Sequence, residues 1–115
     1  MQRLVYKVCT VADWQAALVQ SAYVGSADDL RDGFIHLSTA EQLPGTLARY
    51  FAGQADLSLL SVDAASLGDS LKWEASRGGQ LFPHLYAPLA LTLVICVRSL
   101  PIGSDGNHVL PEDLR

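Results

Sequence analysis

The sequence predicts a single α+β domain over residues 1–115. The predicted elements run strand, helix, strand, helix and then mostly strands, which is typical of α+β proteins rather than of a doubly wound parallel sheet. Half of the 115 residues are hydrophobic, which is enough for one core, but the chain is too short for two. It contains no G-x-G-x-x-G, G-x-x-x-x-G-K-[ST] or C-x-x-C motif, so Rossmann, P-loop and zinc-ribbon folds have no support.

The first strand and helix follow from residue type and capping signals. Residues 4–9 are rich in Val and Tyr and predict a strand. Thr10 and the residues after it resemble a capping box, so a helix would begin here and end before Gly25. Residues 25–33 carry several charges between glycines, which predicts a mobile loop.

A second strand and helix are predicted directly afterwards. Residues 34–37 form a short, mostly apolar run that suits a buried strand. Ser38 and Thr39 begin the patterns S-x-x-E and T-x-x-Q, so a helix start is indicated twice. The apolar stripe of this helix stops at Gly53.

The second half of the chain is mostly strand. Residues 57–62 predict a strong strand, and residues 70–73 predict a shorter one after a turn. Residues 89–97 are almost continuously apolar, which favours a strand buried on both faces. Residues 101–115 predict a turn-rich tail.

Charge and cysteine content limit the partners and the compartment. Eight Lys and Arg residues and a net charge of −4 give no basic stripe, so a nucleic-acid partner is not expected. The N-terminus lacks the apolar core of a signal peptide, and residues 89–97 are too short to span a bilayer. We therefore expect a cytoplasmic protein in which Cys9 and Cys96 are free thiols.

The first candidate site surrounds His36. This imidazole interrupts an apolar strand that leads into the helix start at Ser38 and Thr39. A helix start offers free N–H groups and partial positive charge, which suit an anion such as phosphate. The alternative is that His36 is a hydrogen-bonded core histidine and Ser38 only a cap.

The second candidate site is the segment of residues 73–86. Its Gly-Gly pair would let the backbone approach a ligand closely, and its arginine could hold a phosphate or carboxylate with two hydrogen bonds. The alternative is that Glu74 and Arg77 form an ion pair in a turn while His84 and Tyr86 make internal hydrogen bonds. The polar groups of this segment are Glu74, Ser76, Arg77, His84 and Tyr86.

The histidines could also suggest a metal site. His36, His84 and His108 are far apart in the sequence, and neither H-x-x-x-H nor H-E-x-x-H spacing occurs. We therefore expect no metal. Cys96 is not expected to be a nucleophile, because an apolar strand should raise the pKa of its thiol.

Taken together, these stretches resemble a family of small bacterial and plant proteins catalogued as domain of unknown function 952. The resemblance extends over nearly the whole chain, from about residue 4 to residue 111. The motifs that carry it are Tyr6-Lys7, Trp14, residues 32–39, Gln42, Tyr50-Phe51, residues 73–79 and residues 82–86.

The resemblance implies a fold similar to that of the ADP-ribosyltransferases, with two small, twisted, mostly antiparallel sheets and two main helices packed outside. It also implies NAD as a co-substrate. The string from Ile35 to Ser38 is similar to a strand of the RNA 2′-phosphotransferases, which share that fold and use NAD. Where that superfamily usually carries His or Arg on the first strand, this chain has Tyr6-Lys7.

Three interpretations of the two clusters are open. An enzyme would transfer ADP-ribose or cleave NAD or a related nucleotide, with Glu74 stabilising a cationic ribosyl centre and His36 and His84 as further catalytic groups. A binding module would recognise a small phosphate or nucleotide ligand without turnover, and a structural domain would use both clusters to fix its fold. The expected ligand-binding residues are Tyr6, Lys7, Ser38, Thr39, Ser76, Arg77, Gly78, Gly79 and Tyr86.

Overall fold

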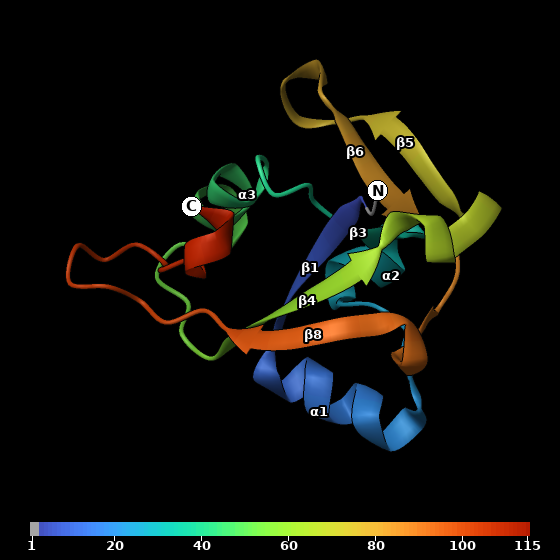
Figure 1. The fold of residues 1–115 in the computed structure, drawn as a ribbon, viewed down its shortest axis with the longest axis horizontal. Coiled ribbons are helices and arrows are strands. Elements are labelled where there is room, and N and C mark those ends of the chain that lie inside the picture. Colours follow the sequence, from blue (N-terminus) through green and yellow to red (C-terminus); the bar gives the residue numbers. More distant parts are fainter. Residues whose placement is uncertain (1–2) are drawn as a thin grey trace.

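The computed structural model describes residues 3–115, and this part of the chain is α+β. Its strands form three small antiparallel sheets with the orders β1-β4-β8, β2-β7 and β3-β6-β5, and three α-helices pack around them (Figure 1). The α+β class and the small antiparallel sheets agree with the expectation, but the expected two sheets and two main helices do not: the described residues form a third sheet, β2-β7, and a third helix, α2. The strands are β1 (Leu4–Thr10), β2 (Ala22–Tyr23), β3 (Ile35–His36), β4 (Leu57–Asp63), β5 (Leu71–Ala75), β6 (Leu81–Leu85), β7 (Leu89–Ala90) and β8 (Val94–Ser99), and the helices are α1 (Val11–Gln20), α2 (Ala27–Asp32) and α3 (Leu43–Tyr50).

Strand β4 lies at the centre of the largest sheet and divides the core. It pairs with β1 on one side and β8 on the other, and its first six residues are all buried. Leu60 and Val62 belong to one hydrophobic cluster, whereas Leu57 and Leu59 belong to a second. Because alternate side chains of a strand point to opposite faces, each face of β4 supports its own half of the core. Both β1 and β4 lie where the sequence predicts strands.

A single pair of backbone hydrogen bonds joins the largest sheet to the sheet β3-β6-β5. Tyr6 N–H donates to the carbonyl oxygen of Ser38 at 2.8 Å, and Ser38 N–H donates to that of Tyr6 at 2.9 Å. Strand β3 ends two residues before Ser38. This bridge therefore brings Lys7, the next residue of β1, beside His36.

Residues 25–33, predicted to be a loop, instead contain helix α2. Ser26 Oγ accepts a hydrogen bond from Asp29 N–H, and Asp29 Oδ2 accepts one from Ser26 N–H, so a complete capping box begins the helix. Gly33 ends it with a φ of 87°, a left-handed conformation that favours glycine. The charges that suggested a loop lie on this helix, where Asp29 is buried.

Helix α3 begins later than the sequence predicts. Ser38 is extended because its backbone is committed to the bridge with Tyr6. Thr39 and Gln42 do bond reciprocally, at 3.0 Å and 3.3 Å, but these bonds close a turn that precedes the helix. The helix starts at Leu43, with a proline in its first turn. Ser38 and Thr39 therefore do not open α3, so the helix N-terminus that the anion-site prediction relied on does not lie at these residues.

Strand β6 was missed by the sequence analysis. It lies between β3 and β5, and Pro83 stands at its centre. Proline in a central strand is rare because it cannot donate a hydrogen bond, so the sequence argued against a strand here. The carbonyl oxygen of Pro83 still accepts a bond from Leu37 N–H at 3.0 Å. The preceding strand, β5, begins one residue later and ends two residues later than the predicted strand over residues 70–73.

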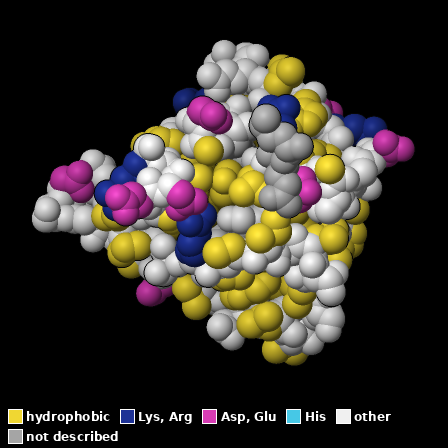
Figure 2. All heavy atoms as spheres, viewed as in Figure 1, with side chains coloured by type: hydrophobic (Ala, Val, Ile, Leu, Met, Phe, Trp, Pro, Cys, Tyr) yellow, Lys and Arg dark blue, Asp and Glu magenta, His cyan; other side chains and the backbone are white. Residues whose placement is uncertain are grey.

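The apolar run at residues 89–97 is not one fully buried strand. It divides into β7, a 3₁₀ turn and β8, and burial alternates along β8. This strand pairs only with β4, so it is an edge, and Ile95 and Val97 remain 55% and 41% exposed. Hydrophobic side chains accordingly gather on the lower part of the surface in Figure 2, where α1 and β8 lie in Figure 1.

The remaining predictions concern the tail and the cysteines. Beyond residue 100 the chain is mostly turns with one isolated bridge between Ile102 and His108 and a final 3₁₀ turn, as predicted. Cys9 and Cys96 are both free thiols, which confirms that prediction. Among residues 3–115, no helix has the length and apolar content needed to cross a membrane.

Candidate functional site

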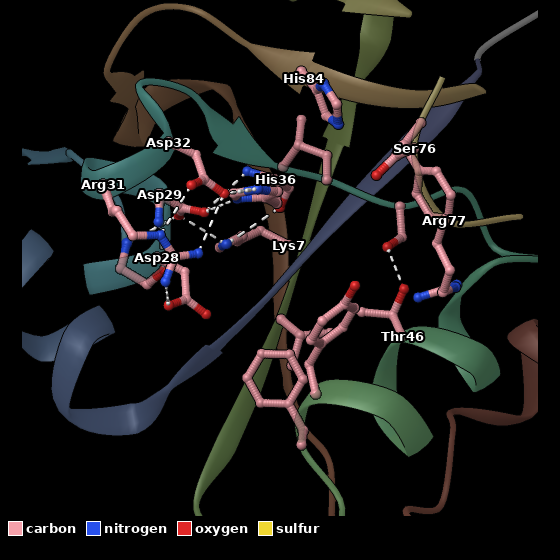
Figure 3. A pocket seen from close by; sticks show the side chains of 17 residues that line it. Lys7, Asp28, Asp29, Arg31, Asp32, His36, Thr46, Ser76, Arg77 and His84 are labelled. Carbon is pink, nitrogen blue, oxygen red and sulfur yellow. Dashed lines mark hydrogen bonds and ion pairs between the residues drawn. The ribbon is translucent and has the colours of Figure 1, made fainter. Parts of the chain in front are cut away.

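The two polar clusters predicted from the sequence line one cavity of about 240 Å³. His36 reaches it from β3, and Ser76, Arg77 and His84 reach it from the β5–β6 hairpin (Figure 3). Helices α2 and α3 supply further walls. The prediction that His36 and the 74–86 segment share one concave site is confirmed.

Helix α2 contributes Asp28, Asp29 and Asp32 to one side of the cavity, which we call the acidic wall. Asp29, which the sequence analysis did not select, lies at its centre. Asp29 contacts Lys7 Nζ at 2.8 Å and His36 Nδ1 at 2.6 Å, and it accepts backbone bonds from Ser26 and His36. Burial by itself would raise the pKa of Asp29. The hydrogen bond from His36 and the charge of Lys7 outweigh that effect and hold the pKa well below its ordinary value.

His36 is held between two carboxylates. Its Nδ1 lies 2.6 Å from Asp29 Oδ1, and its Nε2 lies 3.0 Å from Asp32 Oδ2. Both nitrogens can donate at once only in the imidazolium form. The Asp32 carboxylate also bonds Arg31, and this bond is the main cause of its lowered pKa. The alternative that His36 is simply a core histidine does not describe this residue, because its side chain is 37% exposed and lines the cavity.

A second histidine faces the cavity with a carboxylate behind it. His84 Nδ1 lies 2.8 Å from Glu74 Oε1, and Tyr86 donates its hydroxyl to the same oxygen at 2.7 Å. The bond from Tyr86, followed by that from His84, lowers the pKa of Glu74. Phe34 stacks on the imidazole with a centroid distance of 4.1 Å. Within the described residues Nε2 of His84 has no hydrogen-bond partner, and the side chain is 6% exposed.

Arg77 lies on the other side of the cavity, and no carboxylate among residues 3–115 pairs with it. Its guanidinium carbon lies 4.9 Å from the ring centroid of Phe82 and 5.8 Å from that of Tyr50. No ion pair within residues 3–115 involves Arg77, so the predicted alternative of a pair with Glu74 is wrong. The other half of that alternative is correct, because His84 does bond Glu74 internally.

The predicted site residues divide into two sets. The first lines the cavity and includes Ser38, whose hydroxyl lies 3.0 Å from that of Thr46. The second set does not line the cavity, because its members lie in turns, pack in the core or hydrogen-bond with each other behind His84. The first set is Lys7, His36, Ser38, Ser76, Arg77 and His84, and the second is Tyr6, Thr39, Glu74, Gly78, Gly79 and Tyr86.

Sequence reasoning missed most of the acidic wall. Asp28, Asp29 and Asp32 all line the cavity from α2. The pattern Ser26-x-x-Asp29 is a capping box with Asp in the last position, and it could have indicated this helix. A helix would have placed Asp29 and Asp32, three residues apart, on one face beside His36.

The three histidines do not come together at one place. His36 and His84 are neighbours, with ring centroids 5.7 Å apart, but His108 contacts the carbonyl oxygen of Gln54 in a different part of the fold. In the part of the chain from residue 3 onward, no group of three or more His, Cys, Asp or Glu side chains is arranged to hold a metal ion.

The fold and this cavity define a small α+β protein in which a wall with Asp28, Asp29 and Asp32 faces Arg77 across a cavity. The chain belongs to the DUF952 family, which is described as proteins of unknown function, and the family matches residues 8–97. It is similar to the crystal structure of CC0527 from Caulobacter crescentus, with 51% identity, 96% and 97% of the two chains covered and a TM-score of 0.92. The solution structure of CC0527 matches with 53% identity, 90% of each chain covered and a TM-score of 0.82. No curated protein matches this chain.

Proposed function

We propose that the cavity binds a phosphorylated ribose compound, such as NAD or a related nucleotide. The observation that carries this proposal is that Arg77, within the described residues, makes no ion pair, whereas the cations of the facing wall, Lys7 and Arg31, are paired with aspartates. Arg77, beside Ser76 and Thr46, offers a cation whose donors make no hydrogen bond within the described residues, whereas the carboxylate of Asp32 on the facing wall can accept from hydroxyl groups (Figure 3). A phosphate would bind at the first wall and ribose hydroxyls at the second.

The size of the cavity limits how much of such a ligand it encloses. At about 240 Å³ it lies just below the usual range of ligand pockets, roughly 300–1,000 Å³. A ribose phosphate unit suits this volume, and the rest of a dinucleotide would extend beyond the cavity. The resemblance of the His36 strand to RNA 2′-phosphotransferases, and the ADP-ribosyltransferase-like fold that it implies, support NAD as the nucleotide.

A catalytic role is the second candidate, and the support of His84 favours it. Because Nδ1 donates to Glu74, Nε2 is the nitrogen that can accept a proton from the cavity. In NAD cleavage, the bond from ribosyl C1′ to nicotinamide breaks and its electron pair leaves with nicotinamide. A hydroxyl of water or of an acceptor bonds to C1′ and gives its proton to His84. Glu74 would then orient His84 rather than contact the ribosyl centre.

Thermal shift measurements test the proposal directly. We expect NAD, ADP-ribose and ribose 5-phosphate each to raise the melting temperature, because a ligand that binds only the folded state stabilises it. No shift with any of them would favour the structural interpretation and overturn the proposal. Nicotinamide release from NAD, followed by chromatography, separates the catalytic candidate from binding alone.

A further inference from the structure

Gly45 occupies a place where the backbone does not require glycine. It lies in the first turn of α3 and is exposed, and it is absent from the glycines with positive φ. Glycine within a helix is less favourable than alanine, because its unfolded backbone loses more freedom on folding. Something other than backbone conformation must therefore account for the missing side chain.

The neighbour that fills this space is Arg77. A Cβ atom built on Gly45 would lie 3.0 Å from Nη2 of Arg77 and 3.6 Å from its Cζ. The first distance is shorter than ordinary van der Waals contact, which begins at 3.4 Å, so Nη2 of Arg77 would have to move by a few tenths of an ångström. The guanidinium therefore lies directly against the helix backbone, with Phe82 and Tyr50 on its other sides.

We propose that Gly45 is a positioning residue that seats Arg77 to receive the phosphate group of the ligand. This inference rests on the proposed function. Arg77 comes from the β5–β6 hairpin and makes no ion pair within the described residues, so only packing fixes the place of its guanidinium. A side chain at position 45 would push Nη2 away from this seat. Charge-assisted hydrogen bonds depend on distance and direction, so the displaced arginine would hold phosphate less well.

The experiment measures the binding of ADP-ribose and of inorganic phosphate by NMR titration, which follows weak binding. We expect Gly45→Ala to weaken binding several-fold and Gly45→Leu, which fills the seat, to weaken it about tenfold, within the range for a charged hydrogen bond. Neither variant should lower the melting temperature, since Ala and Leu favour helix more than Gly does. The matched control is Ala48→Gly at an exposed position of the same helix, which should lower the melting temperature and leave affinity unchanged.

A second set of variants tests whether Gly45 acts through Arg77. In an Arg77→Gln background, Gly45→Leu should cause no further loss of affinity, because the group it displaces is gone. A persisting loss would show that Gly45 acts through something else and would overturn the inference. If the wild-type protein binds the probes and Gly45→Leu binds them equally well, the inference about Gly45 is overturned but the proposed function is not. A wild-type protein that binds neither probe would overturn the proposed function and this inference with it.

Discussion

The ammonium group of Lys7 lies 2.8 Å from Oδ2 of Asp29, and the two side chains are only 5% and 1% exposed. The same carboxylate bonds the ring and backbone of His36 and caps α2 through Ser26. One side chain thus joins β1, α2 and β3 at the wall of the cavity. This network gives the acidic wall its fixed shape, and it yields the first two predictions.

Replacing Asp29 should lower the free energy of unfolding. Asp29→Asn leaves Lys7 buried without a counter-charge, and breaking a buried pair from one side typically costs about 3–5 kcal/mol. We expect a loss of this size in the free energy of unfolding, measured by urea denaturation. The control is Asp28→Asn on the same helix, where the carboxylate is 67% exposed and the effect should be small. Similar losses in the two variants would show that the buried pair does not stabilise the fold.

The same carboxylate should determine the acid side of the stability profile. The pKa of Asp29 is lower in the folded protein than its ordinary value of 3.8. Its stabilising contribution is therefore fully present above the unfolded-state pKa and is lost as the pH falls toward the folded-state pKa. The free energy of unfolding of the wild type should fall between about pH 5 and pH 2. Asp29→Asn should show a shallower fall, and an unchanged slope would contradict the assignment.

The hydrogen bond between His84 Nδ1 and Glu74 predicts that the neutral His84 ring has one defined tautomer. With Nδ1 donating to Glu74, Nε2 of the neutral ring should be unprotonated, which nitrogen-15 NMR detects directly. Glu74→Ala removes the acceptor and should let the proton exchange between both ring nitrogens. Tyr86→Phe, the control, removes only the second bond to Glu74 and should preserve the tautomer. A wild-type ring protonated at Nε2 alone would exclude His84 as a proton acceptor in the cavity.

The two cysteines should differ in reactivity. Burial raises the pKa of Cys9 to about 12, whereas Cys96 is only partly buried, on the edge strand β8. Because the thiolate is the reactive form, iodoacetamide should modify Cys96 first in the folded protein. Mass spectrometry after timed quenching would measure both rates, with urea-unfolded protein as the control in which they converge. Faster modification of Cys9 would contradict its burial.

The elements that local signals specify could be predicted from the sequence. Strand β4 is rich in Leu and Val, and its first six residues are buried, whereas α1 follows the N-cap Thr10, whose Oγ1 accepts from Asp13 N–H. Helix α2 was also specified locally, but its charges and flanking glycines predicted a loop, and the capping box that begins at Ser26 was not considered. Strand β6 could not be predicted because proline has no N–H to donate between strands, so Pro83 argued against a central strand.

Only some residues of the candidate site could be predicted from the sequence. His36, Arg77 and His84 are polar groups in apolar or glycine-rich surroundings, and such groups are visible in a sequence. Asp29 and Gly45 gain their importance from partners far along the chain, Lys7 and Arg77, and no local pattern reveals such a contact. Glu74 was visible, but its place behind His84 rather than in the cavity depends on the register of β5 against β6.

The central claim is that Arg77 holds the phosphate of a ligand, and one substitution tests it most directly. Arg77→Lys keeps the charge but loses the fork of two donors, so calorimetric titration with ADP-ribose should show binding weakened by roughly 1–3 kcal/mol. The melting temperature should stay close to that of the wild type, because Arg77 makes no ion pair within residues 3–115. A steep fall in melting temperature with unchanged affinity per folded molecule would instead make Arg77 a structural residue and contradict the account.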